Sequence, residues 1–112
     1  MKKLIIALLF MFANMQVQAQ EVKNKNAKYT TTIKGSCDMC QKRIQKAALT
    51  VSGVKQAIWN IETKELSVIF NENKTSPLDI KTAIAKVGHD SDDVKASDEA
   101  YNKLHGCCKY ER

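Results

Sequence analysis

The sequence predicts an α+β domain with the element order strand, helix, strand, strand, helix, strand. Three observations predict this order. Short stretches rich in β-branched residues alternate apolar and polar positions, which is typical of half-buried strands. Two other stretches space their apolar residues three, four and seven positions apart, as on one face of a helix. Both helical stretches end at a glycine, Gly53 in the first case and Gly88 in the second.

The first strand and the first helix flank a short loop that contains two cysteines. Residues 29–34 alternate in the strand pattern, and Gly35 ends the strand. The spacing becomes helical from Cys40 onward, and Gly53 is expected to end this helix in the left-handed conformation. The apolar face of this helix comprises Ile44, Ala47, Ala48 and Val51.

The next two strands are expected to form an antiparallel hairpin. Residues 54–61 return to an extended pattern, residues 62–65 form a polar turn, and residues 66–70 alternate again. Trp59 lies on this hairpin, and we expect its indole to be in the interior.

A second helix and a weak last strand complete the predicted domain. Pro77 is well suited to the first turn of a helix, and Gly88 ends the helical spacing. The segment 89–96 is short and polar, which predicts an edge strand. The apolar face of this helix comprises Ile80, Ala83, Ile84 and Val87.

Two strand–helix–strand units in one small chain predict a ferredoxin-like βαββαβ sandwich with a four-stranded antiparallel sheet. Both helices are expected to cover one face of the sheet. A short helical tail should follow at 98–104, with Tyr101 and Leu104 attaching it to the domain. The predicted core comprises Ile33, Ile44, Val51, Leu66, Val68, Phe70, Ile80, Ile84 and Val87.

Residues 1–19 are predicted to be a secretory signal peptide. A short basic start is followed by an uncharged apolar run, Leu4 to Ala13, and by a small-residue cleavage site ending at Ala19. The run is shorter than the ~20 residues that span a bilayer. We therefore expect a periplasmic or secreted protein whose mature chain does not span the membrane. The expected organisation is signal peptide 1–19, flexible lead 20–27, folded domain 28–96 and cysteine-containing tail 97–112.

The charge pattern argues against nucleic-acid binding. The formal net charge is +6 for the whole chain and +4 without Lys2 and Lys3. This excess is spread along the chain, without the dense basic and aromatic clusters that nucleic-acid binding requires. A solvated basic face and steering toward an acidic partner are both compatible with it.

The four cysteines form two close pairs, Cys37 with Cys40 and Cys107 with Cys108. Neither pair encloses a long loop, so a disulfide within either would add little stability. Cys37 and Cys40 stand at a helix start, where unpaired N–H groups and the helix dipole favour thiolates. Two thiolates suit Cu(I) or Hg(II), whereas Zn(II) prefers four ligands. The pattern therefore favours a soft-metal site.

Two alternatives use the same pair of cysteines. One is a structural disulfide, and the other is an exported thiol–disulfide oxidoreductase in which Cys37 attacks and Cys40 resolves. A thioredoxin-type site needs a cis-proline facing the cysteines, and the single proline, Pro77, precedes a helix instead. The sequence suggests no acid–base arrangement for a hydrolase or transferase, so we expect a carrier and not an enzyme.

From Tyr29 to Ala96 the chain resembles a heavy-metal-associated (HMA) domain. The family includes small copper chaperones, modules of copper-exporting ATPases and periplasmic mercury-binding proteins. The resemblance implies a βαββαβ fold that binds one soft ion at two cysteines and passes it on by thiolate exchange. The implied partner is a metal-transporting membrane protein or another metal carrier. The matching segments are strand 29–34, Cys37-x-x-Cys40, Ser52-Gly53-Val54 and Ala85-x-x-Gly88-x-Asp90.

Two departures from the family pattern lie near the cysteines. Lys34-Gly35-Ser36 stands where the family has Gly-Met-Thr or Gly-Met-His, so a supporting methionine is missing. We expect Met39 to pack in its place, and the alternative is a thioether neighbour of the metal. His89 stands where the family has an aromatic residue or lysine, in a loop expected beside the cysteines. It is a candidate third ligand, a proton-linked regulator or a solvated residue.

The tail is the third departure, because residues 97–112 lie beyond the basic domain. Cys107 and Cys108 are candidates to complete a four-thiolate zinc site with Cys37 and Cys40. They are equally candidates for a separate soft-metal site or for oxidation.

Overall fold

The computed structural model describes residues 23–112. The predicted signal peptide and the first residues of the lead lie outside this part. No helix among residues 23–112 is both long and apolar enough to cross a membrane. The elements are β1 (Ala27–Thr32), α2 (Asp38–Thr50), β2 (Val54–Trp59), β3 (Glu65–Phe70), α3 (Pro77–Lys86) and α4 (Asp98–Asn102), followed by a 3₁₀ turn at Gly106–Cys108.

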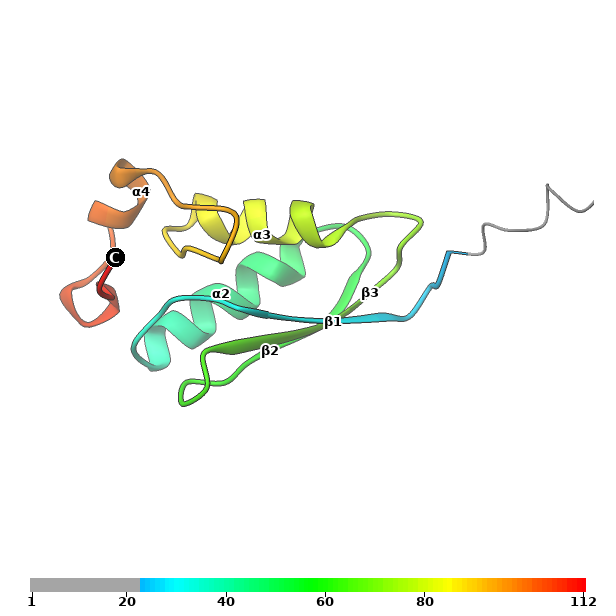
Figure 1. Ribbon diagram of the computed structural model, residues 1–112, viewed down its shortest axis with the longest axis horizontal. Coiled ribbons are helices and arrows are strands. Elements are labelled where there is room, and N and C mark those ends of the chain that lie inside the picture. The colour runs from blue at the N-terminus through cyan, green and yellow to red at the C-terminus, as the bar shows by residue number, and fades with distance from the viewer. Residues whose placement is uncertain (1–22) are drawn as a thin grey trace, which may run out of the picture.

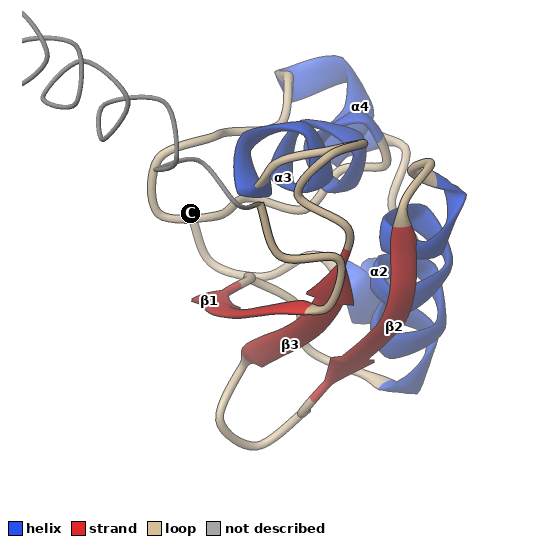
Figure 2. Cartoon of the chain, turned by 90° about the vertical axis from the view of Figure 1, so that its right-hand side faces the viewer, coloured by secondary structure: helices blue, strands red, loops and turns tan. Residues whose placement is uncertain are grey.

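The predicted α+β sandwich is confirmed. The sheet has the order β1-β3-β2, and both pairings are antiparallel. Val68 in the central strand lies opposite Tyr29 on one side and Ala57 on the other. Helices α2 and α3 lie together over one face of this sheet (Figures 1 and 2). The start of α2 and the C-terminal tail lie at the same end of the domain (Figure 1).

The fourth strand predicted at 89–96 is reduced to one bridge, between Ile33 and Ser91. Nearby backbone groups have other partners. The Asp90 N–H donates to the Tyr110 hydroxyl at 3.0 Å, and the Ser91 N–H donates to the Val94 carbonyl at 2.9 Å in a turn. Among residues 23–112 the sheet therefore has three strands, because the tail and this turn use groups that a longer ladder would need.

The core forms where the apolar spacing predicts it. The predicted core residues are buried except Val51 and Val87, which are half-buried near the helix ends. Trp59 is fully buried, as expected. Gly53 has φ of +100°, which confirms its left-handed conformation after α2. Pro77 begins α3, and the preceding Ser76 caps it by accepting from the Asp79 N–H.

The C-terminal tail is docked on the domain. The Tyr110 hydroxyl donates to the Gly88 carbonyl at 2.7 Å. Gly88 has φ of +104°, and a Cβ there would lie 2.9 Å from the Ala100 carbonyl oxygen and 3.0 Å from a Leu104 methyl carbon. The Tyr101 hydroxyl donates to the Tyr110 carbonyl at 2.5 Å. The attaching roles predicted for Tyr101 and Leu104 are confirmed, and the role of Tyr110 is an addition.

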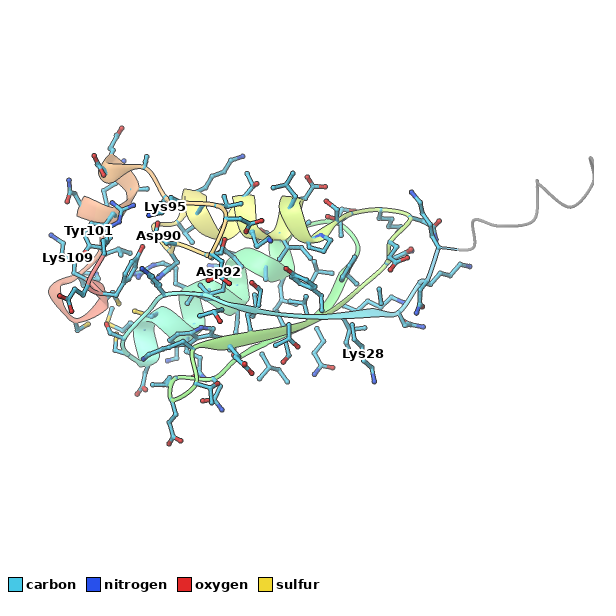
Figure 3. All side chains as sticks on the ribbon, in the orientation of Figure 1. Lys28, Asp90, Asp92, Lys95, Tyr101 and Lys109 are labelled. Atoms are coloured by element: carbon cyan, nitrogen blue, oxygen red, sulfur yellow. The ribbon has the colours of Figure 1, made fainter. Side chains whose placement is uncertain are left out.

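Arg112 ties the end of the chain to a buried carboxylate. Its Nε and Nη2 atoms donate to Asp90 at 3.0 and 3.1 Å, and Nη1 donates to exposed Asp98 at 3.0 Å. The Asp90 side chain also accepts from the Ala96 N–H at 2.7 Å. Figure 3 shows Asp90 beside the tail that carries Tyr101 and Lys109. Residues far apart in sequence are thus joined next to the cysteine loop.

Tyr110→Phe is expected to lower the free energy of unfolding by about 1–3 kcal/mol, because it leaves the buried Asp90 N–H without its partner. Urea denaturation of reduced, metal-free protein measures this loss. Tyr29→Phe is the matched control, since the half-buried Tyr29 hydroxyl contacts Lys81 at 3.3 Å and its loss should cost less. Equal stability of wild type and Tyr110→Phe would contradict the docked tail.

Asp90 is expected to make stability depend on acid pH. Burial alone would raise its pKa, but Arg112 and the Ala96 amide favour the carboxylate and hold the pKa below the ordinary 3.8. A pKa depressed in the folded state stabilises the fold above the unfolded value, and this contribution is lost as pH falls through the folded pKa. The urea midpoint should therefore decline below about pH 4, and less steeply in Asp90→Asn.

The control for Asp90→Asn is Asp98→Asn, which alters the exposed partner of Arg112. Asp98→Asn should follow the wild-type pH curve. Parallel curves for wild type and Asp90→Asn would show that Asp90 does not carry this pH dependence.

Candidate metal site

Four thiols meet where the C-terminal tail contacts the start of α2. The Cys37 sulfur is central, at 3.5 Å from Cys40 Sγ, 3.4 Å from Cys107 Sγ and 3.2 Å from Cys108 Sγ. Figure 3 shows yellow sulfur sticks gathered at this end of the domain. All four cysteines are free thiols. The sulfurs of Cys37, Cys40 and Cys108 all lie within 4.8 Å of one another. The structure therefore brings both sequence pairs together.

The helix start places Cys37 and Cys40 on one side of the loop. Cys37 is the N-cap of α2 in an extended conformation, and its carbonyl accepts from the Gln41 N–H at 3.1 Å. Cys40 follows within the first turn and faces the core, fully buried. Cys37 is half-buried. One thiol of the pair thus reaches toward solvent, while the other is enclosed.

Trp59 supports the loop from below. A Cβ on Gly35 would lie 3.0 Å from the Trp59 ring and 3.2 Å from the Cys40 Cβ, so any larger residue would require the ring or the loop to shift. The indole N–H lies 3.1 Å from the carbonyls of both Ile33 and Lys64. The sequence placed Trp59 in the interior but did not predict this supporting role.

Met39 does not provide the support that we expected of it. Its side chain is 44% exposed, so it does not replace a buried methionine. Its sulfur lies 3.8 Å from Cys107 Sγ instead. The packing prediction is wrong because Trp59 already fills the space under the loop, and Met39 points to the tail on the outer side.

The tail presents its two cysteines differently. Cys108 is fully buried, and its N–H donates to the His105 carbonyl at 2.8 Å within the 3₁₀ turn. Cys107 is exposed, and its carbonyl accepts a hydrogen bond from the Ser36 hydroxyl of the cysteine loop. Vicinal residues thus place one thiol against the core and one toward solvent.

His89 lies next to the strand that leads into the cysteine loop. Its Nδ1 is 2.8 Å from the Lys34 carbonyl, which only accepts, so Nδ1 carries the proton and donates. Its Nε2 is buried without a hydrogen-bond partner among the described residues. The ring stacks on Tyr110 with centroids 5.8 Å apart. His89 is not part of the close group of Cys37, Cys40 and Cys108, and its role as a ligand stays a prediction.

The thiols differ in acidity because they hydrogen-bond to one another. Burial disfavours the Cys37 thiolate, but the Cys108 thiol, the Cys40 backbone amide and the remaining thiols outweigh it and lower the pKa of Cys37 to about 6. Burial and the interactions with Cys40 and Cys37 raise the pKa of Cys108 to about 12, against the effect of Arg43. The cluster therefore favours the thiolate on Cys37 and disfavours it on Cys108.

Arg43 is a cation that acts on the buried groups around the thiols. Its guanidinium favours the Cys108 thiolate, and it also opposes the charged form of His89, whose pKa burial already lowers. Lys42 is exposed on the same turn. Positive charge beside Cys108 is therefore supplied from within the domain by Arg43.

Comparison with known proteins matches residues 30–90 to the family model of the heavy-metal-associated domain. The matched segment contains Cys37 and Cys40 and ends before Cys107 and Cys108. No curated protein sequence gave a significant match.

Several solved structures share the fold. The CopZ metallochaperone is 27% identical with a TM-score of 0.56, covering 58% of this chain and 98% of its own. Oxidized MerP from Ralstonia metallidurans CH34 is 31% identical with a TM-score of 0.51, covering 58% of this chain and 94% of its own. The N-terminal domain of a potential copper-translocating P-type ATPase from Bacillus subtilis, solved in the Cu(I)-loaded state, is 27% identical with a TM-score of 0.55, covering 64% and 98%.

Cys37 is expected to be the first thiol alkylated by iodoacetamide, because the thiolate is the reactive form. Its labelling rate should rise with pH through a midpoint near its pKa of about 6. In Cys108→Ala this midpoint should move up toward the ordinary 9.0, since the Cys108 thiol favours the Cys37 thiolate most. Mass spectrometry of reduced protein labelled between pH 5 and 9 measures both effects.

Cys107→Ala is the control, and it should shift the Cys37 midpoint less than Cys108→Ala does. A Cys37 midpoint near 9 in wild type would contradict the hydrogen-bonded cluster.

Proposed function

Because the chain belongs to the heavy-metal-associated domain family, we propose that it is an exported carrier of a soft metal ion held by Cys37 and Cys40. The leading cargo is Cu(I), and Hg(II) is second. The observation that carries the proposal is the pair of free thiols 3.5 Å apart at the start of α2, inside the matched segment. Thiolate sulfur is the ligand that soft ions prefer. The protein binds and releases its cargo without catalytic turnover.

The relatives support Cu(I) over other soft ions. One of them is described as a metallochaperone, and another is a Cu(I)-loaded domain of a potential copper-translocating ATPase. A metal-transporting membrane protein or another metal carrier is accordingly the proposed partner. Export is supported by the basic start and apolar run of residues 1–19, which lie outside the described residues. The proposed site of action is the periplasm or the extracellular space.

Transfer by thiolate exchange begins at Cys37 in this proposal. Cys37 is half-buried and its pKa is lowered to about 6, whereas Cys40 is fully buried. A thiolate of the partner reaches the ion from the Cys37 side, and the bond to the buried Cys40 is the last to break. The ion therefore moves between proteins without being released into water.

The second candidate function is that of a thiol–disulfide oxidoreductase, which the low pKa of Cys37 favours. The Cys37 thiolate would attack a substrate disulfide, and Cys40 would then displace the substrate from the mixed disulfide. Cys37 and Cys40 end as a disulfide, and the substrate ends as two thiols. Catalysed reduction of insulin in the presence of a thiol reductant tests this function.

Anaerobic Cu(I) titration of the reduced protein against a Cu(I) chelator tests the carrier function. Wild type should bind one Cu(I). Cys37→Ser and Cys40→Ser should each weaken binding by more than about 100-fold, because groups that merely orient a ligand already contribute ~10–100-fold.

The matched control is Cys107→Ser, which alters an exposed thiol outside the close sulfur group and should bind Cu(I) as wild type does. Weak Cu(I) binding that is unchanged by Cys37→Ser would contradict the carrier function. In that case insulin reduction dependent on Cys37 would favour the oxidoreductase instead.

A further inference from the structure

Cys108 is a thiol that a two-cysteine site leaves unused. Its sulfur lies 3.2 Å from Cys37 Sγ, closer than the 3.5 Å between Cys37 and Cys40. It also lies within 4.8 Å of Cys40 Sγ, so the three sulfurs converge on one point. Cys108 lies outside residues 30–90, which match the family, and this convergence is therefore a feature of the tail.

The tail holds Cys108 in place from both sides. On the C-terminal side, the Tyr110 hydroxyl bonds Gly88 and Asp90, and Arg112 pairs with the Asp90 carboxylate. On the N-terminal side, Leu104 is buried against Gly88. These contacts do not involve any thiol. The position of the Cys108 sulfur is thus fixed by the fold and does not depend on hydrogen bonds among the cysteines.

We propose that Cys108 is a third sulfur ligand of the metal ion, so that the tail closes a three-thiolate site made of Cys37, Cys40 and Cys108. This inference rests on the proposed function of Cys37 and Cys40. Each thiol that is still protonated gives its proton to solvent when it binds the ion, and no redox change occurs.

The donor set indicates the class of ion. Three sulfurs suit thiophilic ions that accept fewer than four ligands, such as Cu(I) and Hg(II), whereas structural Zn(II) takes four. A four-ligand zinc site would need Cys107 or His89 as its fourth ligand, and neither belongs to the close group of Cys37, Cys40 and Cys108. Three thiolates around Cu(I) carry a net charge of −2, and the Arg43 guanidinium beside Cys108 offsets part of it.

Copper X-ray absorption of the Cu(I)-loaded full chain tests the ligand count. We expect about three sulfurs per copper in wild type and about two in Cys108→Ser, a nearly isosteric change that keeps the tail packed. The Cu(I) affinity of Cys108→Ser should fall by about tenfold or more, which corresponds to about 1.4 kcal/mol. Cys108→Ala, compared with wild type by urea denaturation without metal, separates loss of a ligand from loss of the fold.

Cys107→Ser is the matched control, since it removes the neighbouring thiol and should leave three sulfurs on the copper. Two sulfurs in wild type, or an unchanged count in Cys108→Ser, would overturn the third ligand while leaving the carrier function intact. Four sulfurs with loss of one in Cys107→Ser would overturn it in favour of a four-thiolate site. Copper binding independent of Cys37 and Cys40 would instead reject the carrier function and this inference with it.

Discussion

The packing of Trp59 beneath the cysteine loop is the contact on which the site depends. The indole lies at the meeting point of β1, the β2–β3 turn and the start of α2, where its N–H lies within hydrogen-bonding distance of the carbonyls of Ile33 and Lys64. The ring also fills the volume below Gly35 and Cys40. A buried Trp contributes a large apolar area and a rigid shape. The backbone that carries both loop cysteines is therefore held from the core side.

The tail is docked by hydrogen-bonding groups that a longer fourth strand would otherwise use. A regular fourth strand would extend the ladder that the Asp90 carbonyl begins by accepting from the Lys34 N–H at 2.8 Å. Instead the Asp90 N–H bonds Tyr110, and the Asp90 carboxylate binds Arg112 and the Ala96 N–H. Only the bridge between Ile33 and Ser91 is left. Buried polar groups need hydrogen-bond partners. The Asp90 N–H and carboxylate, which no strand pairing satisfies, therefore bind Tyr110 and Arg112 of the tail.

The sequence predicted those features that follow from local periodicity. The helical spacing of Ile44, Ala48 and Val51 and the glycine after α2 depend only on near neighbours, and both were predicted correctly. Tyr110 could not be placed in this way, because its partners Gly88 and Asp90 are about twenty positions away and no periodic pattern links them.

The prediction for Met39 failed for a related reason. It assigned a packing role from the family pattern, while the space was already filled by Trp59 from another strand. The sequence did not decide whether Cys108 lies beside Cys37, because a tail of that length can fold in many ways. Long-range packing that joins segments with no shared periodicity is thus the part that sequence patterns do not fix.

A tail-closed site changes the balance between holding an ion and passing it on. Burial of Cys40 and Cys108 keeps water and competing thiols away from two of the three sulfurs. Exchange with a partner then proceeds through Cys37, which is half-buried, at the edge where exposed Cys107 and Met39 lie. In the proposed three-sulfur site, full release requires the tail to move, and the tail is held by the buried contacts of Tyr110 and Asp90. If the tail closes the site as proposed, the stability of the tail and the rate of metal transfer should be coupled through the same few hydrogen bonds.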